Sequence, residues 1–110
     1  MTGSWQVNGV AADVGDAFDW VVVPNPVGDG GSTGVAGGAA IVAFADTEFP
    51  AQVSAFMEFL ASAEAYSQFS AGTLILPAHT EVAASGVDYA TDNAAVLAAL
   101  AAYTAEIPKL

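Results

Sequence analysis

Trp5 and the glycine pair Gly37-Gly38 are the residues of this chain whose types best fit a binding site. A tryptophan beside a glycine turn can present its ring to solvent, where the apolar face of a sugar packs on it. Glycines ahead of an extended segment let a ligand approach the main chain, whose amides then donate hydrogen bonds. We therefore predict a ligand site at Trp5, Gly37 and Gly38. The alternatives, a core tryptophan and a glycine pair that only shapes a turn, stay open at this point.

His79 is the only histidine, and catalysis would have to be built around it. A hydrolytic triad needs a nucleophile, a base and a carboxylate that meet in space, and the sequence has no nucleophile-elbow pattern. Without cysteine, and without the alternating acidic loop of a calcium site, no metal centre is indicated. We expect a protein that is not an enzyme and has no cofactor, with His79 as a loop residue that hydrogen-bonds locally.

The glycine-rich stretch 28–34 invites comparison with phosphate-binding loops. The dinucleotide pattern requires a sixth-position glycine, where this chain has Thr33, and a P-loop requires a lysine, of which none precedes Lys109. The stretch is therefore predicted to be a surface loop, in which Asp29 could still contact a ligand.

The charge of the chain excludes several partners. Twelve carboxylates and one lysine give a net charge of -11. Nucleic acids and anionic membranes are poor partners, because binding to them rests on cationic side chains. An acidic chain favours neutral or cationic ligands. No signal peptide begins the chain, so an export signal is expected upstream of residue 1.

Strands and helices are expected to alternate, which predicts the α/β class. Residues 18–23 and 39–44 are dense in aromatic or β-branched residues and read as buried strands. Residues 5–14 read as irregular or a short helix end, 73–76 as an extended segment closed by Pro77, and 80–85 as a helical turn.

Three helices are predicted from capping residues and apolar spacing. The first opens at Asp46-Thr47, has Pro50 in its first turn, and carries one apolar face: Val53, Phe56, Met57 and Leu60. The second is capped by Ser62 and ended by Gly72. The third begins at Asp92 or Asn93, ends at Ile107-Pro108, and has these inward residues: Val96, Leu97, Leu100 and Tyr103.

Together these pieces resemble the C-terminal part of family 1 extracellular solute-binding proteins, the group that includes the maltose-binding proteins. The resemblance is carried, in order, by Met1 with Gly3-Ser4-Trp5, Phe18-Asp19-Trp20 to Pro24, Gly37-Gly38 to Val42, Phe56, Phe59 and Leu60 with Ser62 and Glu64, Gly72 with Pro77, and Ile107-Pro108. The lysines usual around the amphipathic helix are replaced here by Asp46, Thr47 and Glu48.

The resemblance implies a fold, a function and a place in the cell. It implies a two-lobed periplasmic-binding-protein-like (type II) fold, of which residues 1–110 would be a single partial domain, the C-terminal third. It implies non-catalytic binding of a carbohydrate for an ABC-type importer, with a permease as partner and a periplasmic or extracellular location. In such proteins the segment matching Trp5 stacks on sugar, and the segment matching Gly37 and Gly38 passes near the cleft.

Two alternatives to sugar binding stay open. The solute could be a polyamine or another small metabolite. The chain could instead be a structural fragment that has lost ligand binding and self-associates through apolar surface left by a missing lobe.

Overall fold

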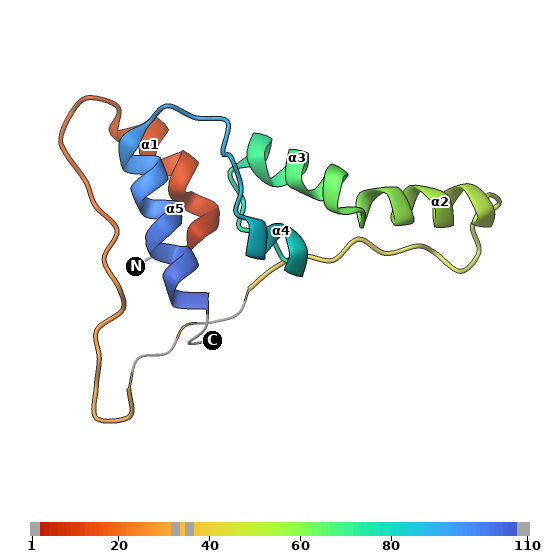
Figure 1. Ribbon diagram of the computed structural model, residues 1–110, viewed down its shortest axis with the longest axis horizontal. Coiled ribbons are helices and arrows are strands. Elements are labelled where there is room, and N and C mark those ends of the chain that lie inside the picture. The colour runs from red at the N-terminus through yellow and green to blue at the C-terminus, as the bar shows by residue number, and fades with distance from the viewer. Residues whose placement is uncertain (1–2, 32–33, 35–36, 108–110) are drawn as a thin grey trace.

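A computed structural model describes residues 3–31, 34 and 37–107, and the described residues are mainly helical (Figure 1). Met1, Thr33, Pro108 and Lys109, which enter the sequence predictions, lie outside this range. The elements in chain order are η1 (Ser4–Gln6), α1 (Val7–Val14), α2 (Pro50–Leu60), α3 (Ala63–Thr73), α4 (Thr80–Ser85) and α5 (Ala94–Glu106). No helix among these residues is long and apolar enough to cross a membrane.

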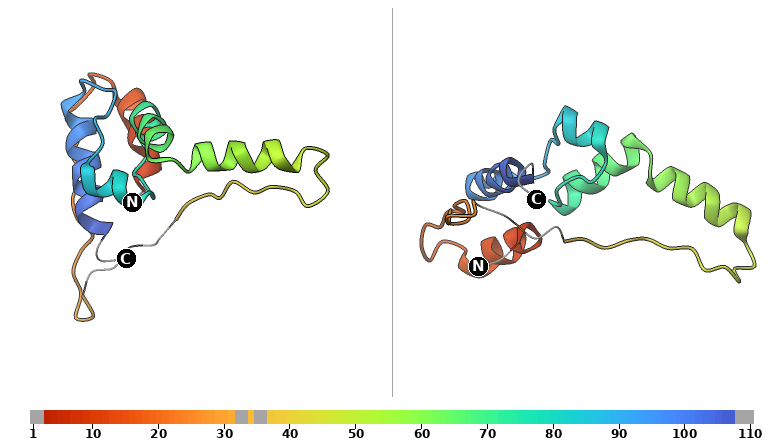
Figure 2. Two further views of the ribbon diagram at one scale, coloured as in Figure 1. Left: turned by 45° about the vertical axis from the view of Figure 1, so that its right-hand side comes forward. Right: turned by 90° about the horizontal axis from the view of Figure 1, so that it is seen from below.

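The core lies between α1 and α5, which run side by side in every view (Figures 1 and 2). Its fully buried members are Val7, Val96, Ala99 and Leu100. Partly buried side chains surround them: Ala11, Trp20, Val22, Leu74, Leu76, Tyr89 and Tyr103. We call α1, α5 and the residues packed on them the body.

Helix α5 is fixed by its cap and by its inward stripe. The side chain of Asn93 accepts hydrogen bonds from the backbone N–H groups of Ala95 (3.0 Å) and Val96 (3.2 Å), which confirms the predicted helix start. Leu97, predicted to face inward, is 40% exposed, so that part of the prediction is wrong. Ala99 takes the inward position instead, since it lies three residues after Val96 on the same face.

The N-terminal segment is more regular than its sequence predicts. Residues 5–14, expected to be irregular or a short helix end, form η1 and the two-turn helix α1. The helix ends at Gly15, which has a positive φ of 50°. Helical structure here follows from packing against α5, because an isolated helix of this length is marginal in water.

The two segments predicted to be buried strands are extended but unpaired among the described residues. In 18–23, Trp20 and Val22 pack against the body, whereas Phe18, Val21 and Val23 are exposed. In 39–44 all the side chains are exposed. The prediction of buried strands is therefore wrong for this structure, because no neighbouring strand covers the second face of either segment.

The turn between these segments makes one antiparallel bridge, Gly28 to Gly31. Each glycine N–H donates to the other's carbonyl, at 3.2 and 2.9 Å, which makes this a hydrogen-bonded pair. The next hydrogen-bonding positions on the same strand are Pro26 and Pro24, and neither has an N–H to donate. The prolines thus remove two successive donors that a longer ladder would need.

Residues 37–60 form a projection that we call the arm: an extended stretch followed by α2 (Figures 1 and 2). Pro50 lies in the first turn of α2, as predicted. Helix α2 begins at Pro50 with Phe49 at its N-cap position, so the predicted opening at Asp46-Thr47 is wrong. The Thr47 hydroxyl accepts a hydrogen bond from the N–H of Phe49 at 3.3 Å, before the helix begins. Helix α2 has no buried residue, and its contacts with other helices are to α3.

Helices α3 and α4 connect the arm to the body. Ser62 caps α3 by accepting from the N–H of Ala65 at 3.3 Å, as predicted. Gly72 was expected to end this helix but lies inside it, and Leu74 at φ 57° is the left-handed residue that ends it. The packing of Leu74 against the core offsets the cost of that conformation. Helix α4 forms where a helical turn was predicted.

Candidate functional site

Trp5 lies in η1 at the start of the body and presents its ring to solvent. The turn is closed by a hydrogen bond from the Gln6 N–H to the Gly3 carbonyl at 3.0 Å. The Trp5 residue is 68% exposed, while the next inward residue, Val7, belongs to the buried core. The core alternative for Trp5 is therefore wrong, and its indole is accessible to a ligand.

The indole also lies close to Gly37, which is far from it in sequence. A β-carbon added to Gly37 would lie 3.7 Å from Cζ3 of Trp5, an ordinary van der Waals distance. A β-carbon added to Gly38 would have no atom within 4 Å. The fold thus brings two of the three predicted site residues close together, with room for about one methyl group between them, and Gly38 follows with open space beside it.

Gly3 is a third glycine at this site, and it is not among the predicted site residues. A β-carbon at Gly3 would overlap Cζ3 of Trp5 and both ring atoms bonded to it, Cε3 and Cη2. The benzene edge of the indole therefore lies directly against the Gly3 backbone.

The site can offer an aromatic surface beside open main chain. An exposed indole supplies an apolar face and one N–H donor, and glycine leaves the backbone approachable. The described residues include neither lysine nor arginine, since the single basic residue is Lys109. An anionic solute would find no cationic side chain among them, whereas a neutral polyol would need none.

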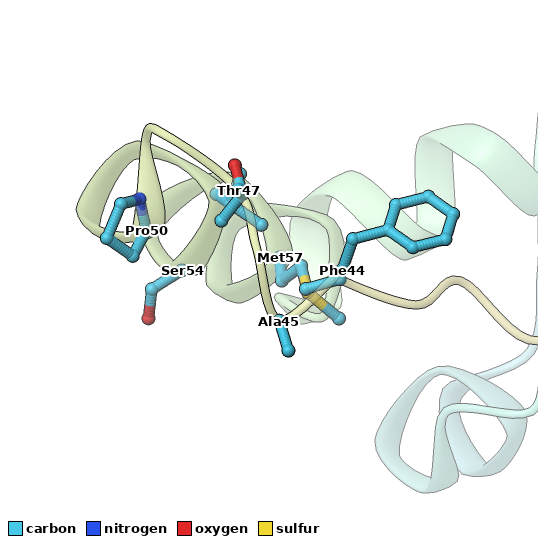
Figure 3. Close-up of a pocket in the computed structure, with 8 residues that line it drawn as sticks. Phe44, Ala45, Thr47, Pro50, Ser54 and Met57 are labelled. Carbon is cyan, nitrogen blue, oxygen red and sulfur yellow. The ribbon is translucent and has the colours of Figure 1, made fainter.

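A separate apolar groove lies in the arm, between residues 43–47 and α2 (Figure 3). Its volume is about 340 Å³, and its lining residues are Ala43, Phe44, Ala45, Thr47, Pro50, Val53, Ser54 and Met57. The two hydroxyls in this lining already have partners, since Ser54 donates to Glu58 at 3.3 Å and Thr47 accepts from Phe49. Neither side-chain hydroxyl of the groove is therefore without a partner, and this weighs against the groove as the site that orients a polar solute.

His79 does not form a catalytic arrangement. It precedes α4 without capping it, and its ring lies 5.9 Å from that of Tyr66 at a tilted angle of 42°. Its Nδ1 is buried without a hydrogen-bond partner, so the predicted local hydrogen bond is not made through that atom. Among the described residues, no group of three or more histidine or acidic side chains could hold a metal ion.

A smaller hollow of about 200 Å³ is lined by residues of both α3 and α4. Its polar lining residues are Ser67, Glu81 and Ser85. Asp29, considered as a ligand contact, lies exposed in the turn between Gly28 and Gly31. Neither Trp5 nor Gly37 lines this hollow.

Comparison with known proteins gives one match. Residues 1–99 match the family model described as bacterial extracellular solute-binding protein. No curated protein and no solved structure matches the chain. The family match spans Trp5, both glycines of the pair, the arm and most of the body.

Proposed function

Because this chain belongs to the bacterial extracellular solute-binding protein family, we propose that it binds a small solute for an ABC-type importer through Trp5, Gly37 and Gly38. Proteins of this family bind solutes outside the cell and are not enzymes. The observation that carries the proposal is the exposed indole of Trp5, which lies close to Gly37. Trp5 and Gly37 are also among the residues that the sequence predicts for a ligand site.

We propose a carbohydrate as the solute. A sugar ring has an apolar face that packs on an indole and hydroxyls that bond to main-chain groups. The absence of cationic side chains among the described residues argues against carboxylates and phosphates as solutes. A polyamine would suit the acidic composition but would leave the apolar face of Trp5 without a function.

We also propose that the chain takes part in a two-lobed α/β architecture. The exposed side chains of 18–23 and 39–44 support this, because unpaired extended segments with apolar residues on an open face are suited to strand pairing. In that architecture the Trp5 site would face a cleft, and a permease would be the transport partner.

Titration calorimetry of the 1–110 chain with mono- and oligosaccharides tests sugar binding. We expect saturable heat with at least one sugar and about a tenfold weaker affinity for Trp5→Ala, since aromatic anchors dominate binding energies. Trp20→Phe is the matched control, because Trp20 packs against the body and not at the site. Saturable binding that Trp5→Ala leaves unchanged would place the site elsewhere, and no heat with any sugar would contradict carbohydrate binding.

Self-association is a second candidate, favoured by the apolar side of α2. Phe56 and Phe59 are three residues apart in α2, which places them on one side of the helix, and Phe49 directly precedes its first residue. All three are exposed. Glu58, the only charged residue in α2, falls on another side, so two copies of this stripe could pack without opposing charges.

Light scattering over a range of chain concentrations tests this second candidate. Mass should rise toward that of a dimer with concentration, and more steeply in high salt, because salt screens repulsion between two chains of charge -11. The double variant Phe56→Ser with Phe59→Ser should stay monomeric, and Phe18→Ser, an exposed phenylalanine outside the arm, should not differ from the parent. A strict monomer under all conditions would exclude this candidate.

A further inference from the structure

The contact between Gly3 and Trp5 has a feature that backbone geometry does not explain. Gly3 has φ -104° and ψ 174°, an extended conformation that any residue adopts. Glycine is therefore not needed at this position for the sake of the main chain. What the position excludes is a side chain, because a β-carbon would overlap the benzene edge of Trp5.

The same edge of the indole faces Gly37. Cζ3 is the ring atom nearest a β-carbon at Gly3 and also the atom that a β-carbon at Gly37 would touch. Nε1 lies on the opposite side of the two-ring system from Cζ3. The benzene edge thus packs on Gly3 and faces Gly37, while the N–H donor points away from both glycines.

We infer that Gly3 is a positioning residue, which sets the indole of Trp5 in its place beside Gly37 and so shapes the solute-binding surface. This inference rests on the proposed function for its consequence in binding, but its geometric part stands separately. Any side chain at position 3 would overlap the ring where it now lies, and the exposed ring is the part that can shift. A shifted ring changes its position relative to Gly37. A binding surface tolerates displacements of only about half an ångström.

The experiment uses the 1–110 chain with Trp20→Phe, so that Trp5 is the only tryptophan. Gly3→Ala is compared with the parent by two measurements on Trp5: fluorescence anisotropy and quenching by acrylamide. We expect lower anisotropy and stronger quenching, because the ring loses the surface that it packs on. Far-ultraviolet circular dichroism should stay unchanged, since the extended backbone at Gly3 accepts alanine.

Gly72→Ala is the matched control. Gly72 lies within α3, and a β-carbon there would meet no atom within 4 Å, so its Trp5 signals should equal those of the parent. Gly3→Val is a second variant and should change both signals further than Gly3→Ala does. Anisotropy and quenching in Gly3→Ala equal to those of the parent would overturn the inference.

Titration with the sugar that the parent binds separates the two claims. Gly3→Ala should weaken that affinity about tenfold, with Gly72→Ala unchanged. A parent that binds no sugar contradicts the proposed function, while the anisotropy and quenching still decide whether Gly3 sets the ring. A Gly3→Ala variant with a displaced ring and parental affinity would overturn the role of Gly3 in binding.

Discussion

The body and the arm are both rich in apolar residues, but they differ in what covers those residues. In the body, Val96, Ala99 and Leu100 of α5 are almost fully buried against α1. In the arm, α2 carries an apolar face of similar spacing and has no buried residue. Phe56 and Phe59 remain 59% and 61% exposed.

The difference shows that helical spacing identifies a face but not its partner. Helix α5 packs against α1, which comes from the opposite end of the chain (Figure 1). Helix α2 is flanked by the extended stretch 43–47, which half-covers Val53 and Met57 and leaves the phenylalanine side open. The stability of the described structure should therefore rest on the body.

The largest expected effect is at the centre of the body. Leu100→Ala should lower the free energy of unfolding by about 3 kcal/mol, because it removes a side chain that is 1% exposed and leaves a cavity. Urea denaturation followed by circular dichroism measures it. Leu97→Ala, the same change on the 40% exposed side of α5, should cost less than about 1 kcal/mol. Equal losses for the two variants would mean that Leu100 is no more buried than Leu97 in solution.

A smaller effect is expected from the helix caps. Asn93→Ala removes the acceptor of two N–H groups at the start of α5 and should cost about 1 kcal/mol of global stability. Ser62→Ala removes the cap of α3, and we expect its effect mainly as faster hydrogen exchange in α3, outside the core. Asp92→Ala is the control for Asn93. Faster exchange throughout α1 and α5 in Ser62→Ala would contradict the separation of the body from α3.

Local signals were predictable from the sequence where the deciding groups lie close along the chain. The cap at Asn93, the cap at Ser62 and Pro50 in a first turn all depend on residues within one helical turn, and all are found. The predicted strands depend on distant partners, and the described residues do not supply them. The helix end was misplaced at Gly72, because packing of Leu74 allowed a left-handed conformation that glycine would normally take.

The residue types of the candidate site could be chosen from the sequence, but their arrangement in space could not. A tryptophan between a glycine turn and polar neighbours indicated an exposed ring, and the ring is exposed. Trp5 and Gly37 lie close together although they are far apart in sequence, and no spacing rule predicts this proximity. The fit of Gly3 against the ring depends on the rotamer of Trp5, which the sequence does not specify.

In the arm, truncation of an aromatic side chain should have little effect on folding. Phe56→Ala should change the free energy of unfolding by no more than about 0.5 kcal/mol, because the side chain is mostly in water and alanine favours the helix. Urea denaturation at low chain concentration, where self-association is absent, measures it. A loss close to that of Leu100→Ala would show that the arm is packed in solution and would remove the contrast with the body.

The smallest expected effect is a change in the free energy of unfolding at alkaline pH, caused by a residue of the body. Tyr89 packs against the core, and burial raises its pKa above the ordinary value of 10.0. The folded chain then keeps the phenolic proton at a pH where the unfolded chain has lost it. The associated stability is complete below pH 10 and is lost as the pH rises through the raised pKa. Tyr89→Phe removes this contribution, so the difference in unfolding free energy between parent and variant should change between pH 8 and about pH 11. A difference that stays constant over this range would mean that Tyr89 titrates alike in both states and is not held in the core.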